Sequence, residues 1–190
     1  APLGISSAEG KGTTHMTIVD KNGNVLVMTT TIESGMGSYR MTNGFLLNNQ
    51  LTDFSVLASD SSGPIANRVQ ANKRPRSSMA PTLVFKMADD GSMGDFLMGT
   101  GSPGGATIIQ YVIKTLVGVL DWGMDVQQAL DAPRFRWIEG DQVAFETGLT
   151  HMARLRLEKL GHVITTNAAP ITMGGGQIIR IDPETGVLQG

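Results

Sequence analysis

The sequence GKGTTHMTIVD, residues 10–20, places two threonines at the start of an apolar, β-prone run and directly after glycines. A threonine at such a junction has the pattern of a concealed N-terminus. Cleavage of the Gly12–Thr13 bond would give Thr13 both a hydroxyl nucleophile and a free α-amine. The α-amine has a reference pKa of about 8, so part of it is neutral near pH 7 and can act as the base for the hydroxyl. The same residues also fit the simple start of a strand, and the rest of the chain has to decide between the two interpretations.

Length and composition indicate a single globular domain. The 190 residues are 41% hydrophobic and 17% charged, which is enough apolar material for a core and too much for a disordered chain. A net charge of −2 gives no electrostatic basis for binding nucleic acid, and no apolar run has the length of a membrane span. The chain has no cysteine, and its three histidines are too scattered for a metal site. We therefore predict neither a metal nor a cofactor.

The first predicted element is a β-hairpin. Residues 15–20 and 25–32 are two β-prone runs that flank an Asn22-Gly23 turn, a strong hairpin signal. The second run is almost continuously apolar or threonine, which predicts a strand that is buried on both faces.

Strand and helix patterns follow in the rest of the chain. Strands are expected at residues 82–86, 95–99, 143–146, 163–164 and 177–181. A helix is predicted where apolar residues recur at helical spacing, at Ile108, Ile109, Val112, Ile113, Leu116, Val117 and Leu120. Asp125 and Gln128 form the pattern of a capping box for a second helix, and residues 150–160 predict a third helix that Gly161 ends. Strands near both ends with helices between them predict a layered α/β or α+β domain.

Three further groups of residues suit the binding of charged or polarised groups. Gly104-Gly105 stands directly before the first predicted helix, where backbone N–H groups can hold an anion or a developing oxyanion, although a tight turn explains the glycines equally well. Ser77-Ser78 lies in a basic, proline-bracketed segment and suits a carboxylate, or is an ordinary surface loop. Side chains that suit an ammonium group, unless they are merely solvated, occur at three positions: Glu33, Gln50 and Asp53.

Taken together and in their order, these segments resemble the small subunit of γ-glutamyltranspeptidases, which are N-terminal-nucleophile hydrolases. The matching pieces span about residues 13–180 and are Thr13-Thr14-His15, Val19-Asp20, Gly23-Asn24, Thr31-Ile32, Leu47-Asn48-Asn49-Gln50, Asp53-Phe54-Ser55, Lys73-Arg74-Pro75, Ser77-Ser78-Met79, Pro81-Thr82, Gly101-Ser102-Pro103-Gly104-Gly105 and Ala132-Pro133-Arg134. Each piece alone is weak, whereas the ordered set is specific.

The resemblance implies an α+β fold, an αββα sandwich of which this chain forms the small-subunit half. It also implies a precursor that cleaves itself between Gly12 and Thr13. Residues 1–12 are then expected to be the tail of a large subunit, and residues 13–190 the small-subunit catalytic domain, truncated before its C-terminus. The large subunit from the same precursor is the expected partner, and a periplasmic or secreted location is implied in the same way.

The resemblance further implies an activity and a role for each site residue. The enzyme would transfer the γ-glutamyl group of glutathione-like amides through a threonine acyl-enzyme to water or to an amino-acid acceptor. The implied roles are Thr13 as nucleophile, Thr31 as its hydrogen-bonding partner in processing, Gly104 and Gly105 as the oxyanion hole, Ser77 and Ser78 as the α-carboxylate site, and Gln50 and Asp53 as the α-amine site.

The sequence departs from the family pattern at four places. Glu33 stands where the family often has asparagine, Thr52 where an acidic residue is common and Arg76 where an apolar residue is usual, and residues 174–176 are all glycine. A carboxylate at position 33 still pairs with an ammonium, but it leaves substrate preference open. The alternatives are a glutaryl-type (cephalosporin) acylase or a poly-γ-glutamate depolymerase of the same fold. A different class of alternative is a catalytically silent, unprocessed fragment that self-associates through a face or edge that the large subunit would cover.

Overall fold

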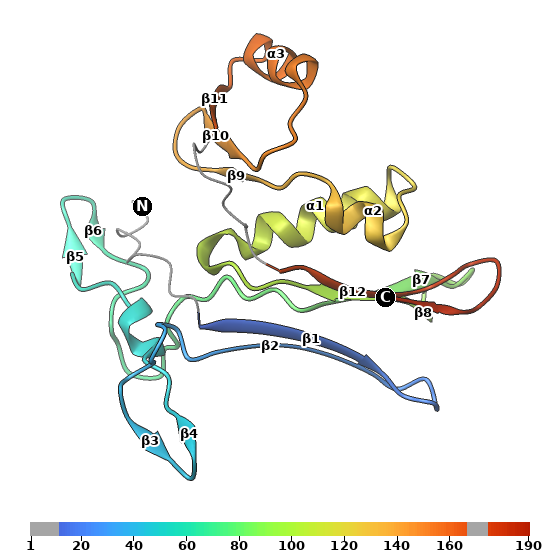
Figure 1. The fold of residues 1–190 in the computed structure, drawn as a ribbon. Coiled ribbons are helices and arrows are strands. Elements are labelled where there is room, and N and C mark those ends of the chain that lie inside the picture. The colour runs from blue at the N-terminus through green and yellow to red at the C-terminus, as the bar shows by residue number, and fades with distance from the viewer. Residues whose placement is uncertain (1–11, 167–174) are drawn as a thin grey trace.

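The computed structural model describes residues 12–166 and 175–190, so most of the expected large-subunit tail, residues 1–12, and the first of the three glycines at 174–176 lie outside the described residues. Three layers follow one another in Figure 1: a two-stranded hairpin, a four-stranded sheet, and a helical layer. The described chain is therefore an α+β structure in which two sheets pack face to face and helices cover one of them.

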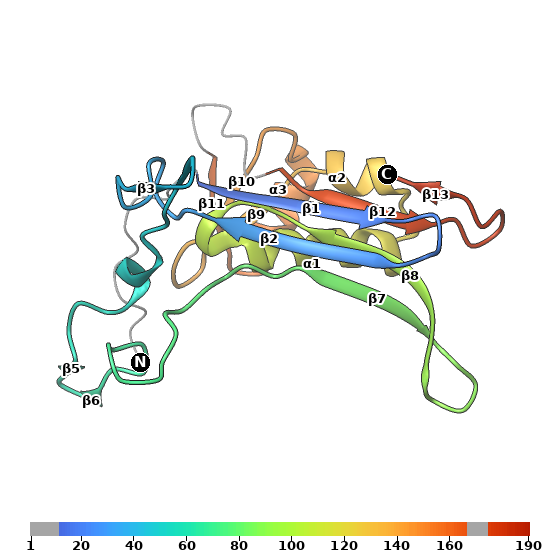
Figure 2. The same ribbon diagram turned by 90° about the horizontal axis from the view of Figure 1, so that it is seen from below.

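The first layer is the hairpin of β1 (Thr13–Val19) and β2 (Val25–Thr31), which pair in antiparallel register. The hairpin prediction is confirmed, and its turn is held by Asp20, whose carboxylate accepts the N–H groups of Asn22 and Asn24. The prediction that the second strand is buried on both faces is wrong. Leu26 is 48% exposed and Met28 is 40% exposed, because only one face of this hairpin packs on the second sheet (Figure 2).

The second layer is a sheet of four antiparallel strands in the order β13-β12-β8-β7. Its strands are β7 (Thr82–Met87), β8 (Met93–Gly101), β12 (Gln177–Ile181) and β13 (Leu188–Gln189). The first three confirm sequence predictions, whereas β13 was not predicted because it is only two residues long. This sheet contacts the β1–β2 hairpin through β8 and β12.

The helical layer consists of a short 3-10 turn η2 (Gly105–Thr107), α1 (Ile108–Leu120) and α2 (Val126–Asp131). The capping box is confirmed, since Asp125 accepts the Gln128 N–H at 2.7 Å and the Gln128 side chain accepts the Asp125 N–H at 3.1 Å. The core between this layer and the sheet is one apolar cluster: Met98, Val119, Val126, Ala129 and Ile178.

The predicted buried stripe of α1 is only partly right. Ile109 is 47% exposed and Ile113 is 51% exposed, and Leu120 is also exposed. The buried side is instead made by residues that include two polar ones and a glycine: Ile108, Tyr111, Val112, Lys114, Thr115, Gly118 and Val119. Gly118 faces α2, and a Cβ there would reach the Ala129 side chain at 3.4 Å, an ordinary van der Waals contact.

Beyond α1 lies a small three-stranded sheet of order β11-β10-β9 (Figure 1). It contains β9 (Phe135–Trp137), β10 (Gln142–Phe145) and β11 (Val163–Thr166), with α3 (His151–Lys159) crossing between the parallel strands β10 and β11. The predicted third helix is confirmed, with Thr150 capping it through the Ala153 N–H and Gly161 after it at φ +95.

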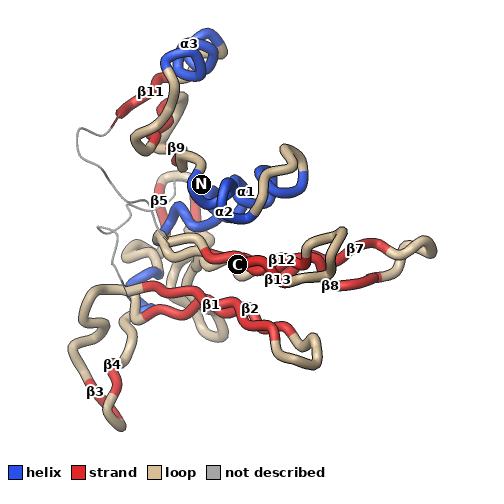
Figure 3. The backbone as a smooth tube through the Cα atoms, turned by 45° about the vertical axis from the view of Figure 1, so that its right-hand side comes forward, coloured by secondary structure: helices blue, strands red, loops and turns tan. Residues whose placement is uncertain are grey.

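The segment between β2 and β7 forms one side of the molecule and is mostly loop (Figure 3). Its short elements are β3 (Met41–Thr42), β4 (Phe45–Leu46), the 3-10 turn η1 (Gln50–Asp53), β5 (Ser59–Asp60) and β6 (Gly63–Pro64). Within the described ranges, no helix has the length and apolarity that crossing a membrane requires.

Candidate active site

The first and last residues of the β1–β2 hairpin form the centre of the site. Thr13 and Thr31 are register partners, and the Thr13 hydroxyl donates to the Thr31 hydroxyl oxygen at 3.0 Å. Thr31 Oγ1 also accepts the backbone N–H of Glu33 at 2.8 Å. The Thr31 side chain is thereby fixed beside Thr13, and the roles of nucleophile and partner that the resemblance implies stay a prediction.

The peptide bond before Thr13 is held by the same hairpin. The carbonyl oxygen of Gly12 accepts the backbone N–H of Ile32 at 3.2 Å. This hydrogen bond extends the β1–β2 ladder by one residue past its last named pair, so the predicted cleavage site lies at the very end of a regular strand pair.

Acidic and amide side chains gather immediately after β2. Gln50 and Asp53 are the first and last residues of the turn η1, and the Gln50 amide donates to the Asp53 carboxylate. Glu33 joins this pair: burial first, and then the neighbouring Asp53 carboxylate, raise the pKa of Glu33, while the Arg76 guanidinium opposes that shift. The structure therefore brings together the three side chains predicted to suit an ammonium group.

Asn49 and Asn67 hold this cluster in place. The Asn49 N–H donates to the Ile32 carbonyl at 3.2 Å, and its side chain accepts the Ser34 N–H at 3.0 Å, so η1 is tied to the end of β2. The Asn67 amide donates to the Asp53 carbonyl at 2.7 Å and accepts the Arg76 N–H at 3.0 Å. The basic segment is thereby joined to the acidic cluster.

The predicted carboxylate site follows directly on that segment. Ser77 is exposed, and its hydroxyl oxygen accepts the Met79 N–H at 3.3 Å, whereas Ser78 is half-buried. The two hydroxyls directly follow Arg76, whose guanidinium acts on the Glu33 carboxylate. Their role as a carboxylate site stays a prediction.

Gly104 and Gly105 form a tight turn at the start of the helical layer. Their φ angles are +141 and +59, a range that favours glycine. Thr107 closes the turn by donating its N–H and its hydroxyl to the Gly104 carbonyl, at 3.3 and 2.8 Å. A side chain at position 104 would lie 2.6 Å from the Tyr111 ring. The tight-turn interpretation is confirmed, and the oxyanion role stays a prediction.

His15 is a structural residue of the hairpin. It is 2% exposed, and its ring nitrogens contact the hydroxyls of Thr29 at 2.7 Å and Thr17 at 3.1 Å. Burial lowers the pKa of the imidazole, which favours the neutral ring. Sequence reasoning missed its close neighbour Gly101, although a glycine at the end of an apolar strand is a signal for close backbone approach.

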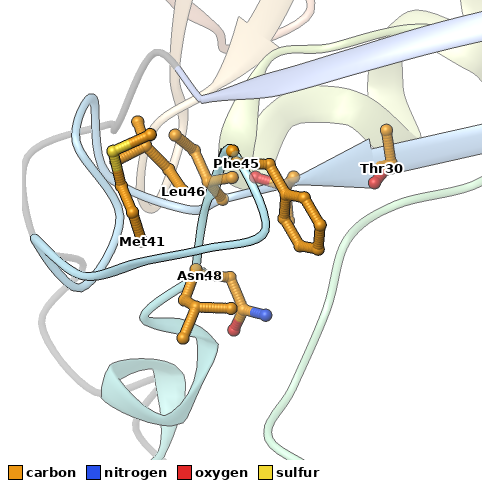
Figure 4. A pocket seen from close by; sticks show the side chains of 9 residues that line it. Thr30, Met41, Phe45, Leu46 and Asn48 are labelled. Atoms are coloured by element: carbon orange, nitrogen blue, oxygen red, sulfur yellow. The ribbon is translucent and has the colours of Figure 1, made fainter.

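Beside Thr31 lies an open hollow of about 680 Å³ that no sequence pattern indicated (Figure 4). Its walls are the end of β2 and the β3–β4 hairpin, with Met41, Phe45 and Leu46 labelled in the figure. Within residues 12–166 and 175–190, no three His, Asp or Glu side chains are grouped so that they could hold a metal ion.

Comparisons with known proteins find relatives over most of the chain. A sequence model of the family described as Gamma-glutamyltranspeptidase matches residues 3–190. The glutathione hydrolase proenzyme of Bacillus subtilis (strain 168) is 39% identical over 180 residues, which are 94% of this chain and 28% of that protein. The chain thus spans little more than a quarter of that relative.

Two solved structures show the same fold. A mutant of Helicobacter pylori gamma-glutamyltranspeptidase superposes with a TM-score of 0.76 and 34% identity over 93% of this chain and 96% of that one. Cephalosporin acylase from Bacillus halodurans superposes with a TM-score of 0.74 and 29% identity, over 92% of this chain and 31% of that one.

Proposed function

The chain belongs to the gamma-glutamyltranspeptidase family, and on that premise we propose that its protein is a self-processing γ-glutamyl hydrolase and transpeptidase. The predicted fold, an α+β structure of the N-terminal-nucleophile hydrolase type, is confirmed by the match to a solved member of the family. The relative in Bacillus subtilis is named a glutathione hydrolase proenzyme, which supports both the substrate class and the self-processing.

The observation that carries the proposal is the contact between the Thr13 and Thr31 hydroxyls at 3.0 Å. After cleavage, the free α-amine of Thr13 would take the proton from its own hydroxyl. The oxygen then attacks the γ-carbonyl carbon of the substrate, the C–N bond breaks, and the leaving amine receives that proton. Water or an amino acid resolves the resulting ester, which gives hydrolysis or transpeptidation.

Substrate recognition would use two groups of polar side chains, the acidic cluster and the serine pair. Glu33 and Asp53 offer negative charge to an α-ammonium, and Gln50 is hydrogen-bonded to Asp53. Ser77 and Ser78, next to Arg76, would receive the α-carboxylate. Gly104 and Gly105 would offer backbone N–H groups to the oxyanion that forms during attack. A γ-glutamyl amide carries an α-ammonium, an α-carboxylate and the amide to be cleaved, which are the groups that these residues would bind.

A large subunit from the same precursor is the proposed partner, with residues 1–12 as its tail. Apolar side chains on the outer face of the hairpin support this proposal, because Ile18, Leu26 and Met28 are 52%, 48% and 40% exposed. Uncovered apolar faces of this kind mark interfaces. By its membership of the family we further propose a periplasmic or secreted location, which fractionation of the native host would test.

The proposed activity is tested by assaying the full-length protein on a γ-glutamyl amide, with Thr13→Ala as the comparison. We expect release of the amine by the wild-type protein and none above background by Thr13→Ala. A wild-type protein that turns over no γ-glutamyl amide, or a Thr13→Ala protein of equal rate, would show that the proposal is wrong.

A second candidate, an acylase for glutaryl-type amides, is supported by the structural match to a cephalosporin acylase. A glutaryl group has no α-amine, so Asp53 would contribute nothing to its binding. For a γ-glutamyl enzyme we expect Asp53→Asn to lower kcat/KM on the γ-glutamyl substrate by about 10- to 100-fold, the loss of one hydrogen bond to a charged group, and to leave the glutaryl substrate unaffected. A better rate on the glutaryl amide in the wild-type protein would favour the acylase.

The alternative of another class is a silent chain that associates with itself through the uncovered face of Ile18, Leu26 and Met28. Light scattering on residues 1–190 alone tests whether the chain associates with itself. A uniform monomer at high concentration would argue against self-association. Oligomers that dissociate in the Leu26→Lys variant would support it.

A further inference from the structure

We propose that the backbone N–H of Ile32 is the oxyanion donor for self-cleavage at Gly12–Thr13, and that the packing around Gly12 requires a residue without a side chain there. This inference rests on the self-processing proposed above and names the groups that carry it out. Its two observations are the hydrogen bond from Ile32 N–H to the Gly12 carbonyl and the space around the Gly12 Cα.

The hydrogen bond places a donor on the atom that becomes negatively charged. Ile32 N lies 3.2 Å from the carbonyl oxygen of Gly12, which is the oxygen of the bond to be cut. The donor is backbone, its position is set by the β2 strand end, and the Ile32 carbonyl is itself held by the Asn49 N–H at 3.2 Å. A fixed donor of this kind stabilises a developing oxyanion without reorganisation during the reaction.

The packing leaves no room for a Cβ at position 12. A Cβ there would lie 2.8 Å from the Glu33 carbonyl oxygen, 3.0 Å from the Ser34 carbonyl oxygen and 3.0 Å from the Ile32 side chain. Two of these three neighbours are backbone atoms of the segment that follows β2. A side chain at position 12 would therefore push the scissile carbonyl away from the Ile32 N–H.

The cleavage step balances with the groups present and one water. The Thr13 hydroxyl oxygen attacks the Gly12 carbonyl carbon, and negative charge forms on the oxygen that Ile32 N–H holds. The C–N bond then breaks, the hydroxyl proton passes to the departing nitrogen, and an ester joins Gly12 to the Thr13 side chain. Water hydrolyses this ester, which leaves a Gly12 carboxylate, the Thr13 hydroxyl and a free α-amine.

The steric half of the inference is tested by Gly12→Ala in the full-length precursor, with cleavage followed by intact mass over time. Gly35→Ala is the matched control, because an added Cβ at position 35 meets no atom within 4 Å and its backbone is not in the left-handed region. We expect Gly35→Ala to cleave at the wild-type rate and Gly12→Ala to be slower by at least about 10-fold, with thermal unfolding midpoints that agree. Equal cleavage rates for the two variants would overturn the steric requirement.

The electronic half is tested by replacing the Ile32 amide with an ester, through incorporation of the α-hydroxy acid counterpart of isoleucine. The matched control is the same replacement at Met28, which occupies an equivalent ladder position four residues earlier on β2 and pairs with Met16. The loss of one oxyanion donor slows a reaction by about 10²- to 10³-fold, so we expect that slowing for Ile32 alone. Equal cleavage by the two ester proteins would overturn the assignment.

These outcomes are distinct from a failure of the proposed function. If the wild-type protein cleaves before Thr13 and then turns over no γ-glutamyl amide, the proposed activity is wrong and the role of Ile32 in cleavage stands on its own result. If the cleaved protein is active while the Ile32 ester matches its Met28 control, the activity stands and the inference is wrong.

Discussion

Thr13 and Thr31 lie at opposite ends of one hairpin in sequence and 3.0 Å apart in space, hydroxyl to hydroxyl. The antiparallel register that begins at the turn, with Val19 opposite Val25, continues without a bulge to Thr13 opposite Thr31. The contact at the site is therefore set by strand pairing, and the Glu33 N–H then fixes the Thr31 oxygen.

The first prediction concerns Thr31. We expect Thr31→Ala to slow both self-cleavage and turnover by about 10- to 100-fold, because a hydrogen bond to a group that develops charge contributes about 1.5–3 kcal/mol. Thr31→Ser keeps the hydroxyl and should retain most of the rate. Thr30→Ala, at the exposed preceding residue of the strand, is the control and should behave as wild type in both assays. A Thr31→Ala protein with wild-type kinetics would contradict the role of this contact.

The second prediction concerns the pH dependence of donor binding. Burial and the neighbouring Asp53 carboxylate raise the pKa of Glu33, so Glu33 holds a proton to a higher pH than an ordinary glutamate. An ammonium group prefers the ionised pair, so KM for the γ-glutamyl donor should fall as the pH rises through the raised pKa. In Glu33→Asn this dependence should disappear. KM measured from pH 4 to 8 for both proteins tests this, and parallel profiles would contradict it.

The third prediction concerns Lys114, which is 6% exposed and donates to the Ala129 carbonyl of α2. Burial, with a smaller contribution from the nearby Arg134, lowers the pKa of Lys114 from 10.5 to about 8. Between these two pH values the unfolded chain holds a proton that the folded chain has lost, so stability rises with pH across this window. Relative to Lys114→Met, we expect the wild-type free energy of unfolding to increase by at most about 3 kcal/mol.

Urea unfolding of both proteins at pH 7.5 and pH 10.5 measures this difference. Other lysines and tyrosines titrate in the same pH range, and the comparison with the Lys114→Met protein removes their contribution. If the free energies of unfolding of the wild-type and Lys114→Met proteins change equally between the two pH values, the lowered pKa of Lys114 is contradicted.

The fourth prediction concerns the contact between Gly101 and His15. A Cβ at position 101 would lie 2.2 Å from Cε1 and 2.3 Å from Nδ1 of the His15 ring, and that ring is held by two threonine hydroxyls. We expect Gly101→Ala to destabilise the protein by about 1–3 kcal/mol, the usual cost of overpacking a core. Thermal unfolding, with Gly35→Ala as control, measures this loss of stability. An unchanged midpoint for Gly101→Ala would count against the close contact between Gly101 and His15.

Local signals in the sequence were sufficient for much of the fold. The Asn22-Gly23 signal located the hairpin but not its register, because the loop that forms runs from Asp20 to Asn24 and puts Val19 opposite Val25, which in turn puts Thr13 opposite Thr31. The Asp125 and Gln128 pattern correctly gave the start of α2, because a capping box satisfies backbone groups within a single turn.

Features that depend on neighbours far along the chain were not predictable in the same way. The apolar residues of α1 spread over a wide arc, so periodicity could not tell that Ile108 and Val112 are buried while Ile109 and Ile113 are exposed. The strand β9 is too short for a pattern.

At the site, residue types indicated the ammonium-binding set, but not its internal geometry. The proximity of Glu33 to Asp53, 20 residues later, arises from the loop that returns to the end of β2. That return depends on Asn49, whose N–H donates to the Ile32 carbonyl and whose side chain accepts the Ser34 N–H.

The most direct test of the central claim is to trap the acyl-enzyme. The purified full-length protein is mixed with a γ-glutamyl donor, quenched in acid within the first turnover, and analysed by intact mass and peptide mapping. The account predicts a piece that begins at Thr13 and carries the added mass of one γ-glutamyl group on that residue. A protein that remains uncut, or that carries the γ-glutamyl group on any other residue, would contradict it.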